Sequence, residues 1–105
     1  MINITFKAKT LELEVNGHAE HGEKRDAIVC AAVSTLFYTL AQALCDSENM
    51  LKKKPVIKDK DGAGYISCKP KKEFEGNIVR TYWTILVGLE FIANEYKDFI
   101  NFDIE

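Results

Sequence analysis

Two residues in the first third of the chain have the chemistry needed for nucleophilic catalysis. Cys30 lies in an apolar run, and His18 lies twelve residues before it, in a segment that contains Gly17 and Gly22. A thiolate can attack a carbonyl carbon, while an imidazole takes the thiol proton and later gives a proton to the leaving amine. The pair is therefore the minimum set of side chains for nucleophilic catalysis at a carbonyl group.

The expected position of Cys30 on a helix supports this chemistry. Asp26 is a plausible N-cap, so the sequence predicts that Cys30 lies in about the first turn of a helix. Unpaired backbone N–H groups at a helix start stabilise a thiolate and can also hold an oxyanion. The competing interpretation is structural, because cysteine is among the most buried residue types. Spacing alone leaves both interpretations open.

Three other cysteine or metal chemistries lack the residues they need. Leu36 stands where a phosphatase-type Cys-x5-Arg loop requires arginine, and the chain has no Cys-x-x-Cys pair. His18, His21 and Cys30 supply only three zinc ligands without a matched fourth. We therefore expect no metal and no cofactor. Ser34, one helical turn after Cys30, is a candidate substrate contact or a hydroxyl bonded back to the helix.

The charge balance argues against nucleic acid as the main ligand. Fourteen basic and sixteen acidic residues give a net charge of −2, so the chain has no global positive field, and we expect no direct nucleic-acid partner. Six lysines flank a predicted second hairpin: Lys52, Lys53, Lys54, Lys69, Lys71 and Lys72. A solvated rim is the favoured interpretation, and a weak RNA or ribosome contact is the alternative.

Cysteine use and the N-terminal residues favour a cytoplasmic protein. Cys30 and Cys45 would lie about 22 Å apart on one helix, which excludes a disulfide between them. We expect Cys45 and Cys68 to be small packing residues in a reducing compartment. The first seven residues resemble a strand rather than a secretory signal.

One uncharged stretch reaches the lower length limit of a membrane span. Residues 27–44 contain no charged side chain. However, Thr35, Thr39 and Gln42 cluster on one side of the predicted helix, and apolar residues line the other side. This amphipathic pattern is typical of a helix that covers a sheet.

Hydrophobic periodicity predicts a single domain over residues 1–105. Alternation at residues 2–8 and 11–15 predicts a hairpin, residues 17–25 form a mobile loop, and a helix follows to about residue 45. Residues 52–61 and 65–69 predict a second hairpin, residues 74–97 a second helix, and residues 99–104 a last edge strand or a tail. The expected fold class is α+β, a mainly antiparallel sheet with two helices packed on one face, in the order ββαββα with a possible short C-terminal strand.

The second predicted helix carries more apolar surface than one sheet can cover. Trp83, Val87 and Phe91 form a row at i, i+4 and i+8, separate from the stripe that should face the sheet. A two-fold dimer would bury this row. The competing account is that residues 99–104 fold back over it and leave a monomer.

The order of motifs around Cys30 resembles the ribosomal-processing cysteine protease family, Prp. The run Gly17-His18-Ala19, then Gly22, then Ile-Val-Cys-Ala-Ala-Val-Ser at residues 28–34, is similar to the family signature G-H-A, a short loop and D-I-V-C-A-A-V-S. The resemblance covers the whole chain and implies an α+β homodimer with His18 as the base and Cys30 as the nucleophile. Ser34 matches the serine that ends the motif. One position departs: Ala27 stands where the family has aspartate, and Asp26 is displaced by one residue.

The resemblance also implies a substrate. Family members remove the N-terminal extension of the precursor of large-subunit ribosomal protein twenty-seven, so it implies peptide hydrolysis through an acyl-enzyme during ribosome biogenesis. The mobile loop would close over the peptide, and Gly17 and Gly22 would belong to the substrate-binding loop. Two alternatives stay open: a non-enzymatic ribosome-associated module that uses the lysine-rich hairpin, and a structural dimer without chemistry.

Overall fold

The computed structural model describes residues 1–17 and 24–105, which form a five-stranded sheet and two long helices. The elements follow in the order β1 (Ile2–Lys7), β2 (Glu12–Gly17), α1 (Lys24–Asp46), β3 (Val56–Lys60), β4 (Ala63–Ser67), α2 (Glu75–Glu95) and β5 (Ile100–Ile104). Two short 3-10 helices, Glu48–Met50 and Lys72–Phe74, precede β3 and α2. The predicted α+β class and the order ββαββα with a short last strand are confirmed.

The sheet has the strand order β3-β4-β2-β1-β5 and is mainly antiparallel. The pairs β1–β2, β2–β4 and β3–β4 are antiparallel, and β5 runs parallel to β1 with Ile100 opposite Ile2. β5 is thus an edge strand and does not fold back over α2. The account in which residues 99–104 cover the apolar row of α2 is wrong.

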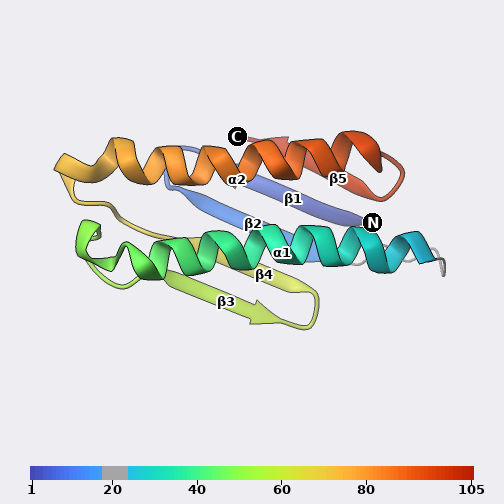
Figure 1. Ribbon diagram of the computed structural model, residues 1–105, viewed down its shortest axis with the longest axis horizontal. Coiled ribbons are helices and arrows are strands. Elements are labelled where there is room, and N and C mark those ends of the chain that lie inside the picture. The colour runs from blue at the N-terminus through green and yellow to red at the C-terminus, as the bar shows by residue number, and fades with distance from the viewer. Residues whose placement is uncertain (18–23) are drawn as a thin grey trace.

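Both helices lie on the same face of the sheet, side by side and in opposite directions (Figure 1). Buried side chains of α1 recur at Val29, Val33, Phe37, Leu40 and Leu44, a spacing that puts them on one face of a helix. They meet the inner face of the sheet, where alternate residues such as Ile4, Phe6, Leu13 and Ile66 are buried. The predicted amphipathic helix that covers a sheet is confirmed.

Among the described residues, the segment Asp26–Asp46 is long and apolar enough to cross a membrane by length and composition. A third of its most apolar window is buried within the fold. Those buried side chains belong to the core between α1 and the sheet.

The second hairpin is shorter at its start than its sequence suggests. Residues 52–61 predict one strand, but β3 begins only at Val56. Pro55 has no N–H to give to a strand ladder, which explains why the strand starts after it. Before it, Leu51 forms an isolated antiparallel bridge with Pro70.

Candidate active site

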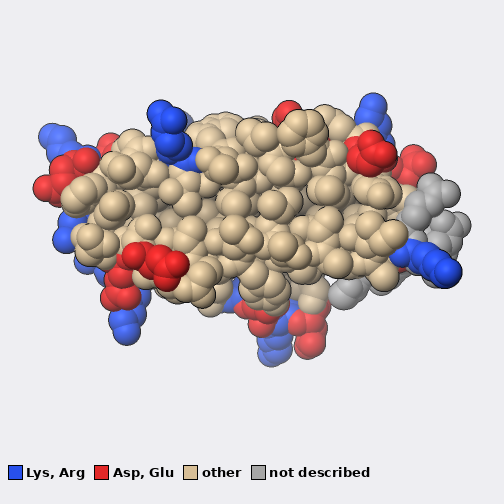
Figure 2. Space-filling view, viewed as in Figure 1, with Lys and Arg blue, Asp and Glu red and all other residues tan. Residues whose placement is uncertain are grey.

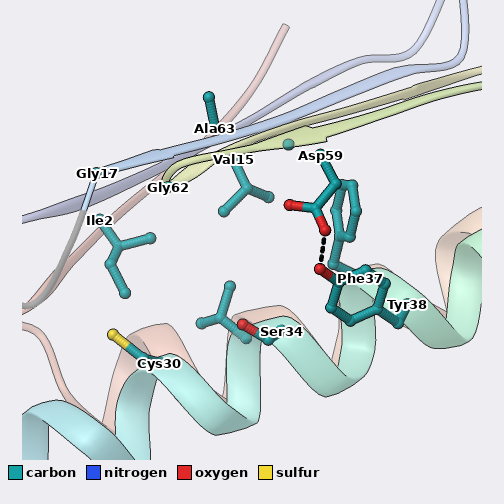
Figure 3. Close-up of a pocket in the computed structure, with 12 residues that line it drawn as sticks. Ile2, Val15, Gly17, Cys30, Ser34, Phe37, Tyr38, Asp59, Gly62 and Ala63 are labelled. Carbon is teal, nitrogen blue, oxygen red and sulfur yellow. Dashed lines mark hydrogen bonds between the residues drawn. The ribbon is translucent and has the colours of Figure 1, made fainter.

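A cleft of about 210 Å³ lies between α1 and the sheet, at the end where β2 and β3 finish and β4 begins (Figure 3). One wall is the helix, and the other is formed by the last residues of β2 and the β3–β4 turn. Its lining is mostly apolar: Ile2, Val15, Gly17, Cys30, Val33, Ser34, Phe37, Tyr38, Asp59, Gly62, Ala63 and Gly64. Such a lining with a few polar groups is typical of a binding site for an organic ligand or a peptide.

Three side chains with chemical function follow one ridge of α1 along the cleft. Cys30, Ser34 and Tyr38 are spaced at i, i+4 and i+8, so each lies about one turn, or about 6 Å, after the previous one. The Cys30 side chain is half-buried, and its sulfur points toward the cleft in Figure 3. Ser34 is exposed. A thiol and a hydroxyl therefore share one wall of the cleft.

The position of Cys30 along the helix differs from the prediction. α1 begins at Lys24, so Cys30 is its seventh residue and lies in the second turn rather than the first. The first four N–H groups of a helix are the unpaired ones, so those of α1 are not at Cys30. Thiolate and oxyanion stabilisation by a helix start therefore has no support here. Asp26 lies inside the first turn and is not the N-cap, although a carboxylate there suits the helix dipole.

A hydrogen bond joins α1 to β3 at the end of the cleft away from Cys30. The Tyr38 hydroxyl donates to the Asp59 carboxylate (Figure 3). This bond, together with the nearby negative charge, raises the pKa of Tyr38 above its ordinary value, so the phenol remains protonated and able to donate. The bond connects the edge strand β3 to α1, and both residues line the cleft at this end.

Close packing of a glycine against a ring forms the floor of the cleft. A Cβ on Gly64 would lie 2.7 Å and 2.8 Å from two ring carbons of Phe37, so only glycine fits here without movement of the ring. At the other end, the Gly17 N–H donates to the Gly62 carbonyl over 2.9 Å. Gly17 has φ of +98°, a conformation that favours glycine, and it is the last residue of β2 rather than the first of a loop.

The structure brings some of the predicted site residues together and leaves others untested. Cys30, Ser34 and Gly17 line the same cleft. His18, His21 and Gly22 lie outside the described residues, as does the central part of the predicted mobile loop. The placement of the His18 imidazole beside the Cys30 thiol therefore stays a prediction.

The two other cysteines differ from each other. Cys68 is buried, and the Tyr82 hydroxyl donates to its sulfur over 3.6 Å, so its predicted packing role is confirmed. Burial raises the pKa of the Cys68 thiol. Cys45 is exposed near the end of α1, and its predicted role as a packing residue is wrong. Its position is on the solvent side, one residue after the buried Leu44.

No group of three or more His, Cys, Asp or Glu side chains within residues 1–17 and 24–105 is arranged to hold a metal ion. His18 and His21, two of the three zinc ligands considered from the sequence, lie outside these ranges.

Sequence reasoning missed part of the cleft. Tyr38 and Asp59 are 21 residues apart and on different elements, so no local motif connects them. Phe37 and Gly64 are likewise recognisable as partners only once β4 lies over α1. The one available signal was the helical spacing from Cys30 through Ser34 to Tyr38.

Comparison with known proteins gives consistent matches over nearly the whole chain. The sequence model of the family described as cysteine protease Prp matches residues 1–101. The ribosomal processing cysteine protease Prp of Staphylococcus aureus is 26% identical over 97 residues, which are 92% of this chain and 89% of that relative.

Solved structures share the fold. The crystal structure of an essential ribosomal processing protease Prp from S. aureus, in complex with a covalently linked product peptide, has a TM-score of 0.77 at 24% identity and full coverage of both chains. A protein from Streptococcus mutans has a TM-score of 0.69 at 26% identity, covering 98% of this chain and 90% of that one.

Proposed function

The chain belongs to the cysteine protease Prp family, and from this premise we propose that Cys30 is its nucleophile and His18 its general base. Family membership makes the chain a cysteine protease. The proposal adds the identity of the catalytic residues and of the substrate. The observation that carries the proposal is the half-buried Cys30 thiol on the wall of a mostly apolar cleft. We take the whole chain, residues 1–105, as one catalytic domain.

The proposed reaction is peptide hydrolysis through an acyl-enzyme. His18 takes the Cys30 thiol proton, the sulfur attacks the scissile carbonyl carbon, and the tetrahedral intermediate collapses as the C–N bond breaks. The imidazolium gives its proton to the leaving amine. Water then attacks the thioester, with His18 taking a proton from water, and the carboxylic acid leaves as the Cys30 thiol reforms.

The cleft supplies the length for an extended peptide beside the thiol. From Cys30 to Tyr38 the helix rises by about 12 Å, the length of three to four extended residues. Such a segment would pass Ser34, which we propose as a substrate contact together with the Gly17 and Gly22 loop. The Tyr38–Asp59 bond would mark its far end.

We propose a ribosomal protein precursor as the substrate. The curated relative is named a ribosomal processing protease, and a crystal structure of the S. aureus enzyme contains a substrate peptide. By analogy, the substrate here is the large-subunit ribosomal protein twenty-seven precursor with its N-terminal extension, cleaved in the cytoplasm. Membership of a protease family favours this function over a non-enzymatic ribosome-associated module.

A homodimer is the proposed assembly. Trp83, Val87 and Phe91 are 41%, 54% and 70% exposed on α2, as the helical spacing predicts. A two-fold contact between two copies of this row would remove the aromatic surface from water.

Intact-mass measurement of a precursor incubated with the purified protein tests the proposal. We expect one cut that removes the N-terminal extension, no cut with Cys30→Ala, and a rate about 10²- to 10⁴-fold lower with His18→Ala. Cys45→Ala and His21→Ala are the matched controls and should retain most activity. A Cys30→Ala protein that cuts at the normal rate, or a larger loss with His21→Ala than with His18→Ala, would overturn the residue assignment.

A further inference from the structure

A second cleft, of about 520 Å³, lies at the other end of the sheet from Cys30. It is formed by the β1–β2 turn, the segments on either side of the second hairpin, and the start of α2. Its lining is Ala8, Lys9, Thr10, Leu11, Lys52, Cys68, Lys69, Pro70, Glu75 and Val79. Three of these residues are lysines and one is a carboxylate, so the lining carries a net positive charge.

The backbone fixes two of these lysines beside each other. The Lys52 N–H donates to the Lys69 carbonyl over 2.8 Å, and the Lys71 N–H donates to the Met50 carbonyl over 2.8 Å. Leu51 is buried at the centre of this bridge and anchors it to the core. The side chains that extend from these paired segments carry like charges, which repel one another and which a bound anion would neutralise.

The lysines of the cleft are available to a ligand. Lys9, Lys52 and Lys69 are exposed. Within the described ranges, the ion pair Lys7–Glu14, at 4.0 Å, involves none of the three. Lys53, Lys54, Lys71 and Lys72 continue the same segments in the sequence, followed by Glu73.

Charge is unevenly distributed over the surface. The outward face of the two helices is nearly free of charged side chains, whereas charged side chains gather at the ends and along the edge of the molecule (Figure 2). Side chains of both signs gather there in Figure 2, and the net charge of −2 does not describe the lining of this cleft, which has three lysines and one glutamate. The expectation of no direct nucleic-acid partner rested on that global value.

We propose that this lysine-lined cleft binds the phosphate backbone of RNA. Lysine ammonium groups are point charges suited to phosphate oxygens. No aromatic side chain is among the described residues of the lining, so bases would not stack there and binding would not depend on sequence. Residues 30 to 46 alone span about 24 Å of helix, so a bound strand would leave the Cys30 cleft open.

Fluorescence anisotropy with a labelled 20-nucleotide single-stranded RNA of mixed sequence tests the proposal. Neutralising three phosphates predicts a slope of log K against log salt of about −2, or a roughly 16-fold loss of affinity between 50 and 200 mM salt. The variant K9Q/K52Q/K69Q should bind at least tenfold more weakly at 50 mM salt and show a flatter slope. The control K24Q/K60Q/K97Q removes the same charge from exposed positions outside the cleft and should bind like the wild type.

Three results would overturn the proposal. The first is no binding by the wild type at 50 mM salt, and the second is equal weakening by both triple variants, which would mean that only net charge matters. The third is displacement of the RNA by polyglutamate of equal charge at equal concentration, which would assign the cleft to acidic proteins. Since RNA binding is read without a peptide substrate and can be repeated with Cys30→Ala, its failure is distinguishable from failure of the proposed peptidase.

Discussion

The replacement of Gly64 by alanine tests how tightly the Cys30 cleft is packed. The new Cβ would lie 2.7 Å and 2.8 Å from two carbons of the Phe37 ring. Carbon atoms in good contact are about 3.5 to 4.0 Å apart, so at least one of the two residues must move by about 0.8 Å. The Phe37 ring is 4% exposed and has little room to move.

The magnitude follows from two opposing effects. Overpacking of a core costs about 1 to 3 kcal/mol, while restricting the unfolded chain by a glycine-to-alanine change returns about 0.4 to 1 kcal/mol. We therefore expect Gly64→Ala to lower the free energy of unfolding by about 1 to 2 kcal/mol, which corresponds to a fall in Tm of about 5 to 15 °C for a domain of this size. Because both residues line the cleft, KM for the peptide should also rise.

Thermal unfolding followed by circular dichroism provides the assay, and Gly76→Ala is the matched control. A Cβ on Gly76 would meet no atom within 4 Å, and Gly76 lies in the first turn of α2. Its alanine variant should therefore be as stable as the wild type or slightly more stable. The double variant Gly64→Ala with Phe37→Leu should be less destabilised than the sum of the single changes. A Gly64→Ala protein with the wild-type Tm would refute the reasoning.

Three further predictions concern other parts of the molecule. In the folded protein, Cys45 should react with iodoacetamide within the time in which Cys68 remains unlabelled, because only Cys45 is exposed; mass mapping checks this, and equal labelling would contradict it. Hydrogen bonds from Thr10 and Tyr65 hold the pKa of Glu12 below its usual 4.5. The stabilisation from these bonds is complete above pH 4.5 and is lost as the pH falls through the lowered pKa. Tyr65→Phe should therefore be less stable than the wild type at about pH 7, and the difference in stability should shrink in acid unfolding curves below about pH 4. Sedimentation should show a dimeric wild type and a monomeric Phe91→Lys, whereas a dimeric variant would place the interface elsewhere.

The two helices and the exposed apolar row of α2 could be predicted from the sequence, because a period of 3.6 residues depends only on neighbours along one helix. Trp83, Val87 and Phe91 are exposed where the spacing placed them. The start of α1 was harder to predict. Lys24 and Arg25 follow a glycine-containing polar segment and resemble loop residues, but they belong to the helix. Asp26, the expected N-cap, also belongs to the helix, so Cys30 is the seventh helical residue rather than the fourth and lies in the second turn rather than the first.

The order of the strands in the sheet, and the wall of the cleft opposite α1, could not be predicted from the sequence for a different reason. The placement of β4 beside β2, and of β5 parallel to β1, depends on how two helices cover one sheet rather than on any local pattern. The Tyr38–Asp59 bond needs both the register of β3 and the rotation of α1. The lysine pair at Lys52 and Lys69 likewise depends on a single backbone bridge between distant segments.

The parallel pairing of β1 with β5 has a consequence for how the chain folds during its own synthesis. Ile2 and Ile100 are partners, so one edge of β1 has no strand beside it until nearly a hundred further residues have been made. Contacts of such high sequence separation form late and slow the folding of a domain. Until then, the nascent chain exposes the N–H and C=O groups of one edge of an apolar strand, which can pair with other chains. Docking of β5 covers this edge of β1 and moves the open edge of the sheet to β5, a strand of five residues.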